Sequence, residues 1–194
     1  MTHMHIAGSI HADYSGIQPQ WLHRPEDLNE LDLKLWPRGT HRDEGGELIL
    51  AGAPATELLA QHGSPAYFID ETDFRARCSE FRDAFEGWSI YYASKSLLTK
   101  TVARWVCEEG LSMDVTTLGE MSIALAGGMP AERLAFHGNN KSVEEIEFAL
   151  ERGIGEFIVD SFQEIERIEA AAEARGETAR ALVRVTTGVE AHTH

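Results

Sequence analysis

An amine suited to covalent chemistry stands just beyond an apolar, strand-like run: Lys95 follows Ser89–Ala93. Later strand-like runs carry polar groups at the same place: Asp114, the cluster from His137 to Lys141, Asp160, and Arg184. The C-terminal ends of parallel strands in α/β folds open on one face, so we expect one shared site. A lysine backed by carboxylates there is placed to form an imine with an aldehyde. A surface lysine that ends a strand is the alternative interpretation.

The reactivity of Lys95 depends on its surroundings. Desolvation or nearby cations make an amine more nucleophilic, and we expect the apolar residues 90–93 to supply such surroundings. Asp114 ends the next strand, where its carboxylate would hold a cationic lysine or arginine in register. Glu120 falls in the first turn of the following helix, and we interpret it as a charge that suits the helix dipole.

A polar turn, His137-Gly-Asn-Asn-Lys141, follows the next strand. Glycine and asparagine accept left-handed dihedral angles, so the turn suits a purely structural role, but its many donors also suit a binding loop beside Lys95. Both interpretations stay open. Arg184 alternates with apolar neighbours in the last run and is expected to point into the mouth of the site. It needs an anionic partner there, either Asp114 or the phenolate oxygen of a cofactor.

Strand-like and helical segments alternate regularly from Pro65 onward. Strands are expected at Ala66–Ile69, Ser89–Ala93, Ser112–Val115, Leu134–Phe136, Phe157–Val159 and Ala181–Val185. Amphipathic helices are expected near residues 72–86, 97–109, 118–127, 142–152 and 161–175. The strands start roughly every 22 to 25 residues, the step of a βα unit in a TIM barrel.

These segments predict an α/β fold, an incomplete TIM-like (β/α) barrel of about six βα units. An open doubly wound sheet is the alternative, which we disfavour because neither G-x-G-x-x-G nor G-x-x-x-x-G-K-[ST] occurs. Ser142-Val-Glu-Glu145 is a capping box, and Gly153 and Gly176 are placed to close helices with a left-handed turn.

The stretch before the alternation is organised differently. Residues 1–45 are polar and carry five histidines, which predicts an arm or linker. Residues 46–63 contain the strand-like run Glu47–Ala51 and a short helix, Thr56–Gln61. Neither forms a core alone, so we expect this strand to pair with chain that is not local to it. Residues 64–194 would then form the barrel portion.

Composition narrows the function classes. The 194 residues are 43% hydrophobic and 25% charged, which is ordinary for a globular protein. A formal charge of −15 without any Lys/Arg-rich run argues against nucleic-acid or anionic-membrane partners. The two cysteines, Cys78 and Cys107, lack metal-type spacing and suit a reducing cytoplasm, and no apolar run approaches a membrane span. His192 and His194 would share one side of an extended segment, but no nearby ligand completes a set, so no metal site is predicted.

Four segments, taken together, resemble a known family: Tyr91-Tyr-Ala-Ser-Lys95, Gly110-Leu-Ser-Met-Asp114-Val-Thr-Thr-Leu-Gly-Glu120, His137-Gly-Asn-Asn-Lys-Ser142 and Val183-Arg184-Val-Thr-Thr-Gly-Val-Glu-Ala-His-Thr-His194. In this order and spacing they are similar to the diaminopimelate decarboxylases, within the fold-type III pyridoxal-phosphate-dependent enzymes. The resemblance runs from about Leu33 to the end. Ser96-Leu97 departs from the family, which more often has Ala followed by Asn or Phe.

The resemblance implies pyridoxal 5′-phosphate as the cofactor, bound covalently by Lys95. It implies that Asp114, His137 and Arg184 surround the cofactor and that Asn139 lines the substrate pocket. The implied reaction is decarboxylation of meso-diaminopimelate to L-lysine, the last step of lysine biosynthesis, by a homodimeric enzyme.

The resemblance also implies a TIM-like barrel followed by a β-domain, to which the strand Glu47–Ala51 would belong. The family's phosphate loop, its ring-stacking histidine, the acid for the ring nitrogen and the partner-supplied residues are expected beyond His194. We therefore expect an N-terminal part of an enzyme, inactive by itself. The alternatives are another fold-type III enzyme, such as an ornithine or arginine decarboxylase or an amino-acid racemase, and a non-catalytic fragment.

Overall fold

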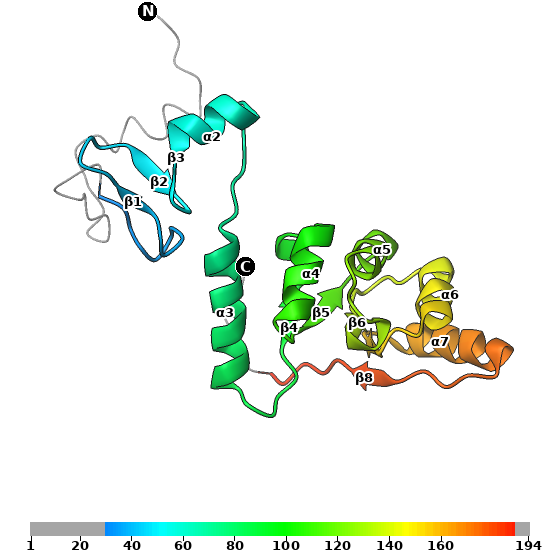
Figure 1. Ribbon diagram of the computed structural model, residues 1–194. Coiled ribbons are helices and arrows are strands. Elements are labelled where there is room, and N and C mark those ends of the chain that lie inside the picture. The colour runs from blue at the N-terminus through cyan, green and yellow to red at the C-terminus, as the bar shows by residue number, and fades with distance from the viewer. Residues whose placement is uncertain (1–29, 189–194) are drawn as a thin grey trace, which may run out of the picture. The chain divides into compact units, whose positions relative to one another are not determined.

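The computed structural model describes residues 30–188, which divide into two units between Ala66 and Tyr67 (Figure 1). The first unit contains three short strands and one helix: β1 (His41–Arg42), β2 (Leu48–Leu50), β3 (Ala53–Pro54) and α2 (Ala55–His62). The second contains a parallel sheet with its helices. Among the described residues, no helix has the length and apolar character needed to cross a membrane.

The strands of the first unit form a local antiparallel sheet in the order β1-β2-β3. Asp43 closes the first turn by accepting hydrogen bonds from the backbone N–H groups of Gly45 and Glu47, both at 2.9 Å. Ala51 and Gly52 both have positive φ angles, which is the geometry of a two-residue hairpin. The expectation that the strand at Glu47–Ala51 has no local partner is therefore wrong, because two tight turns bring its neighbours alongside it.

The described end of the predicted arm also belongs to this sheet. Residues 41–42, placed by the sequence in an arm or linker, form β1 and pair with Leu48 and Ile49. Thr40, just before them, is buried. The membership of this unit in a larger β-domain stays a prediction.

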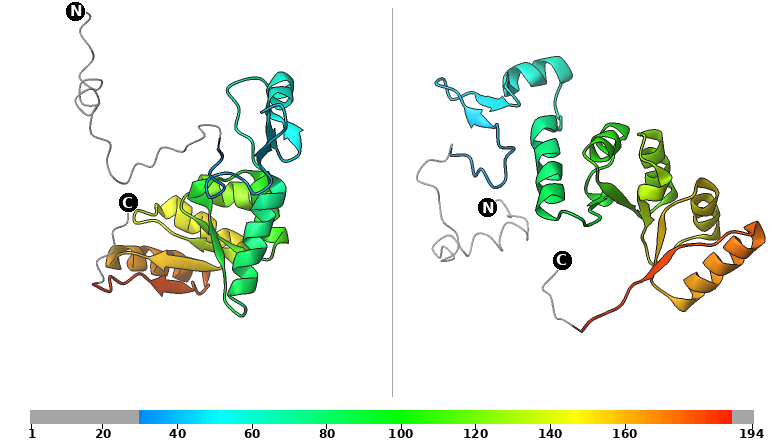
Figure 2. Two further views of the ribbon diagram at one scale, coloured as in Figure 1. Left: turned by 90° about the vertical axis from the view of Figure 1, so that its left-hand side faces the viewer. Right: turned by 60° about the horizontal axis from the view of Figure 1, so that its bottom comes forward.

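The second unit is built around five parallel strands in the order β4-β5-β6-β7-β8. They are β4 (Tyr91–Ala93), β5 (Ser112–Val115), β6 (Leu134–Phe136), β7 (Glu156–Val159) and β8 (Ala181–Val183). Its helices are α3 (Glu71–Ala84), α4 (Lys100–Glu108), α5 (Leu118–Ala126), α6 (Val143–Arg152) and α7 (Phe162–Arg175). The helices lie on one face of the sheet (Figure 2). This order has no reversal point, which an open doubly wound sheet requires.

One predicted strand is absent. Ala66–Ile69 was expected to open the parallel sheet, but no strand pairs with it within residues 30–188, and the Tyr67 side chain is 99% exposed. Helix α3 begins directly afterwards, capped by Asp70, whose carboxylate accepts a hydrogen bond from Asp73 N at 3.1 Å. The described sheet thus has five parallel strands rather than six, because an apolar run forms a strand only beside a partner.

The core lies between the sheet and its helices. Alternate strand residues point towards the helices and are buried there: Met113 and Val115 on β5, Leu134 and Phe136 on β6, and Phe157 and Val159 on β7. The intervening residues face the opposite side of the sheet, because side chains alternate along a strand. That opposite side carries the predicted site.

Each helix that follows a parallel strand begins at a serine or threonine cap. Thr99, Thr117, Ser142 and Ser161 accept hydrogen bonds from backbone N–H groups of α4 to α7 in turn. The capping box predicted at Ser142–Glu145 is confirmed, as are the left-handed closures at Gly153 and Gly176. Because each helix starts at such a cap, the loop between the preceding strand and the helix has a defined end.

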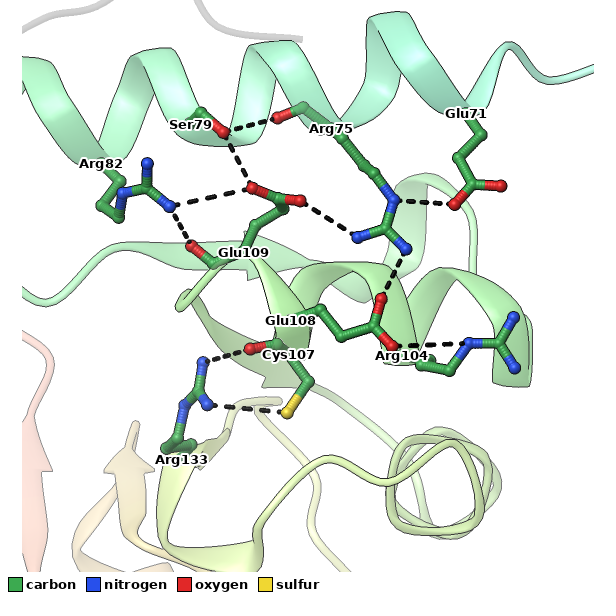
Figure 3. A network of polar contacts seen from close by, with 9 residues as sticks. All are labelled: Glu71, Arg75, Ser79, Arg82, Arg104, Cys107, Glu108, Glu109 and Arg133. Atoms are coloured by element: carbon green, nitrogen blue, oxygen red, sulfur yellow. Dashed lines mark hydrogen bonds and ion pairs between the residues drawn. The ribbon is translucent and has the colours of Figure 1, made fainter.

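Helix α3 is fastened to the end of α4 by a polar network (Figure 3). Arg75 Nη1 donates to Glu109 Oε1 at 3.0 Å, and Ser79 Oγ donates to Glu109 Oε2 at 2.8 Å. Arg82 Nη1 donates to the backbone oxygen of Glu109 at 2.8 Å. The hydrogen bonds from Ser79 and Arg75 lower the pKa of the Glu109 carboxyl. The network holds α3 against the C-terminal end of α4, just before β5 starts.

Candidate active site

A cavity of about 450 Å³ opens at the C-terminal ends of the parallel strands. Its apolar wall includes Ala93, Ile158 and Leu182, which stand on the face of the sheet away from the helices. Its polar lining includes four residues predicted from the sequence: Lys95, Asp114, His137 and Arg184. Asp114 lies on strand β5, and the other three lie just after strands β4, β6 and β8. The parallel sheet therefore brings together groups that the chain separates by up to 89 residues, from 95 to 184.

Lys95 lies in a short 3-10 helix, η1 (Ser94–Ser96), directly after β4. Two side-chain contacts hold the backbone on either side of it: Ser96 Oγ donates to Ala93 O at 2.5 Å, and Tyr92 Oη donates to Leu97 O at 2.8 Å. The expected desolvated surroundings are not found, because Lys95 is exposed. The apolar lead-in packs elsewhere: the Tyr92 ring lies against Phe74 of α3, with 5.6 Å between ring centroids.

Asp114 and His137 form a pair across β5 and β6, with 3.2 Å between Asp114 Oδ1 and His137 Nε2. Burial raises the pKa of the Asp114 carboxyl. The charge and hydrogen bond of His137 oppose that rise, and so does the charge of Lys95. The carboxylate was expected to hold a lysine or arginine in register; its contact is instead the imidazole, and Lys95 acts on it through charge.

Arg184 finds a different partner from the one proposed. Its Nη1 lies 3.5 Å from Asp160 Oδ2, so the carboxylate beside it is Asp160 of the β7–α7 loop rather than Asp114. Asp160 directly follows β7, the strand next to β8, whereas Asp114 lies on β5, three strands away from β8. The Arg184 side chain is 70% exposed, while that of Asp160 is 16% exposed. The guanidinium thus stands at the mouth of the cavity, steadied by a largely buried acid.

Asn139 is exposed and does not line this cavity, so its role in a substrate pocket stays a prediction. Glu120 is placed as expected in the first turn of α5, where it accepts a hydrogen bond from Thr116 N at 2.5 Å. His192 and His194 lie outside the described residues. Within residues 30–188, no group of three or more His, Cys, Asp or Glu side chains is arranged to hold a metal ion.

The sequence did not reveal the role of Lys141. It was interpreted only as one donor of the polar turn, but the structure buries it completely beneath the loop. Its Nζ contacts Glu164 Oε1 at 2.6 Å, across 23 residues of chain. The one available signal was its position directly before the Ser142 cap, where a lysine has a short path into the layer between strand ends and helices.

The chain is similar to proteins of known function. The family model described as pyridoxal-dependent decarboxylase, pyridoxal binding domain, matches residues 71–194. The diaminopimelate decarboxylase of Mycobacterium tuberculosis is 49% identical over 169 residues, which cover 87% of this chain and 38% of the relative. That of Mycobacterium leprae is 45% identical over 194 residues, which cover 98% of this chain and 41% of the relative.

A solved structure of a diaminopimelate decarboxylase has a similar fold. The diaminopimelate decarboxylase of Helicobacter pylori, solved as a complex with L-lysine, has a TM-score of 0.67 and 32% identity, covering 72% of this chain and 36% of that one. The chain spans about two fifths of the length of the curated relatives it matches. Because the family model matches more than half of its residues, the chain belongs to the pyridoxal-dependent decarboxylases, and residues 71–194 match their pyridoxal binding domain.

Proposed function

We propose that this chain forms the lysine-bearing wall of a pyridoxal phosphate site in an enzyme that converts meso-diaminopimelate to L-lysine. The observation that carries the proposal is the position of Lys95 on one cavity with Asp114, His137 and Arg184. The identity to the M. tuberculosis decarboxylase and the likeness to an H. pylori decarboxylase solved with L-lysine support the choice of reaction. The activity is proposed for the full-length protein, of which this chain is a part.

The groups on the cavity fit an anionic aromatic aldehyde. Lys95 supplies an amine, Arg184 supplies a second cation, and the apolar wall suits the face of a ring. Ser94 also lines the cavity, and its buried hydroxyl has no hydrogen-bond partner among the described residues. Buried hydroxyl groups normally have one, so a polar ligand in the cavity would satisfy it.

Each residue has a distinct task in this proposal. When bound, pyridoxal phosphate supplies the electron sink for the pair left behind as the α-carboxylate departs as carbon dioxide. Lys95 would hold the cofactor covalently through its side-chain amine until the substrate amine replaces it. Arg184, steadied by Asp160, pairs with an oxygen anion at the cavity mouth. The contact of His137 Nε2 with Asp114 Oδ1 orients the Asp114 carboxyl on the cavity.

We also propose that β4 to β8 form part of the wall of a (β/α)₈ barrel in the full-length protein. The sequential order of the parallel strands and the helices on a single face support this architecture (Figure 2). A homodimer is proposed on the family resemblance alone. A cytoplasmic location is proposed as well, and it is consistent with both cysteines being free thiols.

Borohydride reduction tests the covalent site in this chain. After incubation with pyridoxal phosphate and reduction, we expect one label per chain, found on Lys95 by peptide mapping. Lys95→Arg removes this label because arginine does not form a stable imine. Lys100→Arg, an exposed position at the start of α4, is the matched control and should leave the label in place. Label scattered over several lysines would contradict a preformed site.

Product analysis tests the reaction in the full-length protein. With meso-diaminopimelate we expect L-lysine and carbon dioxide in equal amounts, and with ornithine no carbon dioxide. Release of putrescine from ornithine at a comparable rate would overturn the proposed substrate and identify an ornithine-type decarboxylase. Release of racemised diaminopimelate without carbon dioxide would identify a racemase instead.

A further inference from the structure

A buried ion pair lies directly beneath the candidate active site. The Lys141 side chain is 0% exposed and the Glu164 side chain is 4% exposed. Lys141 Nζ donates to three oxygens: Gly138 O at 2.7 Å, Ile158 O at 2.6 Å and Glu164 Oε1 at 2.6 Å. An ammonium group has three N–H donors, so all of them are used.

These three contacts join the ends of two neighbouring strands. Gly138 follows His137 at the end of β6, and Ile158 is a cavity-lining residue of β7. Because one nitrogen binds both backbone oxygens at short range, it sets the separation between the two strand ends. The ammonium also lies 5.2 Å from the centre of the Phe136 ring, which completes its surroundings on the core side.

Glu164 extends the connection towards β8. Its second oxygen, Oε2, accepts a hydrogen bond from the backbone N–H of Asp160 at 2.7 Å. The carboxylate of Asp160 in turn lies 3.5 Å from the guanidinium of Arg184. An unbroken series of polar contacts therefore runs from the loop after His137, through Lys141 and Glu164, to Arg184.

We propose that Lys141 and Glu164 are positioning residues that set the places of His137 and Arg184 on the cavity. A geometric role is favoured over a stabilising one, because replacing a buried ion pair by apolar side chains of similar volume is often neutral or stabilising. Directional bonds to fixed oxygens, by contrast, specify distances that apolar packing does not. The proposal rests on the proposed function only in taking this cavity as the cofactor site.

The double variant Lys141→Met/Glu164→Met separates positioning from stability. It removes both charges together and keeps similar side-chain volumes, so we expect its melting temperature to stay close to that of the parent chain. The links to Gly138, Ile158 and Asp160 are lost. We therefore expect amide exchange at Asp160, followed by NMR without cofactor, to accelerate at least tenfold, and the imidazole signals of His137 to shift.

Glu164→Gln is the second variant, should the double variant not fold. An amide has one acceptor oxygen, and the charged ammonium of Lys141 is the stronger donor, so the oxygen turns to Lys141 and the Asp160 N–H faces the NH₂ group. We expect faster amide exchange at Asp160 with little change in side-chain volume. The matched control is Arg175→Met/Glu177→Met, which removes an exposed ion pair with 3.0 Å between Arg175 Nε and Glu177 Oε2, and it should leave both NMR signals unchanged.

Affinity for pyridoxal phosphate, measured by absorbance, links the positioning to the site. We expect the double variant to bind at least tenfold more weakly and the control to bind like the parent chain. Unchanged Asp160 exchange and unchanged His137 signals in a folded Lys141 or Glu164 variant would overturn the proposal. If the parent chain itself binds no pyridoxal phosphate at Lys95, the proposed function fails, while the NMR measurements still decide the positioning role.

Discussion

Asp114 is the residue of the site whose protonation the structure controls most directly. Burial favours the neutral acid and raises its pKa, while the nearby imidazole of His137 and the more distant amine of Lys95 favour the carboxylate. The pKa of Asp114 therefore depends on two opposing effects, desolvation and the nearby positive charges. Replacing His137 or Lys95 should therefore change the pKa of Asp114.

Substitutions at His137 should raise the pKa of Asp114 further. His137→Phe removes both the charge and the hydrogen bond that oppose burial, whereas His137→Gln removes the charge and keeps a donor, so the rise should be larger for phenylalanine. Lys95→Met should give a smaller rise in the same direction, because its charge has the weakest of these effects. Titration of the Asp114 carboxyl carbon by NMR checks the order, and a lower pKa in either His137 variant would contradict it.

The same pKa direction has a consequence for stability. A carboxyl group whose pKa is higher in the folded chain stabilises the fold below its ordinary pKa and loses that contribution as pH rises through the raised value. Asp114→Asn should therefore raise the melting temperature at neutral pH and have little effect in acid. A lower melting temperature for Asp114→Asn at neutral pH would show instead that the folded chain stabilises the charged carboxylate.

The sequence predicted four of the polar positions that line the cavity, but not their partners. Lys95, Asp114, His137 and Arg184 were found because polar residues at strand ends share one rim in a parallel sheet. The pairing of Arg184 with Asp160 depends on the order of strands and the reach of side chains. The burial of Lys141 depends on a contact with Glu164, 23 positions away, which its place beside the Ser142 cap does not specify.

At the scale of elements, one glycine allows two helices to approach each other. An ideal Cβ on Gly127, at the end of α5, would stand 2.6 Å from Ala103 Cβ and 2.7 Å from Lys100 O, both on α4. Neither neighbour is the end of a flexible side chain. Helices α4 and α5 therefore keep their spacing only while residue 127 lacks a side chain.

Gly127→Ala should destabilise the second unit by about 1–3 kcal/mol, the usual range for overpacking, because α4 and α5 must separate. Gly119→Ala in the same helix is the control: its Cβ would meet only Thr117 Oγ1, at 3.7 Å. Alanine there should be neutral or stabilise by about 0.5–1 kcal/mol through helix propensity. Urea unfolding measures both, and equal effects would argue against the close approach.

The predictions of secondary structure were correct where residues next to each other in the sequence determine where an element begins and ends. Helix α6 was expected at 142–152 and runs from Val143 to Arg152, because a capping box starts it and a left-handed glycine ends it. The prediction of a strand at Ala66–Ile69 was wrong, because an apolar run of four residues does not show whether another strand lies beside it. The antiparallel pairing of Leu48–Leu50 was not predicted, because the two strands that pair with it have only two residues each and show no recognisable strand pattern.

At the scale of the whole molecule, the outer strands of the parallel sheet are its exposed edges. Within residues 30–188, β4 and β8 each pair with one strand only. All three residues of β8 are exposed, and Val185 just after it is 71% exposed. Unpaired backbone groups beside apolar side chains favour pairing with a second chain. The net charge of −15 opposes such association through mutual repulsion.

Val185→Lys should reduce self-association of this chain, because a lysine beside an edge strand disfavours pairing with another strand. The added lysine makes the net charge less negative by one unit, which by itself would weaken repulsion between chains and increase association. A decrease in association would therefore show that the β8 edge is involved. Phe81→Lys on α3, where the side chain is 59% exposed, changes the charge equally away from the sheet. Sedimentation velocity over a concentration series should show less association for Val185→Lys than for Phe81→Lys. Equal behaviour of the two variants, or a parent chain that stays monomeric throughout, would show that the β8 edge does not control assembly.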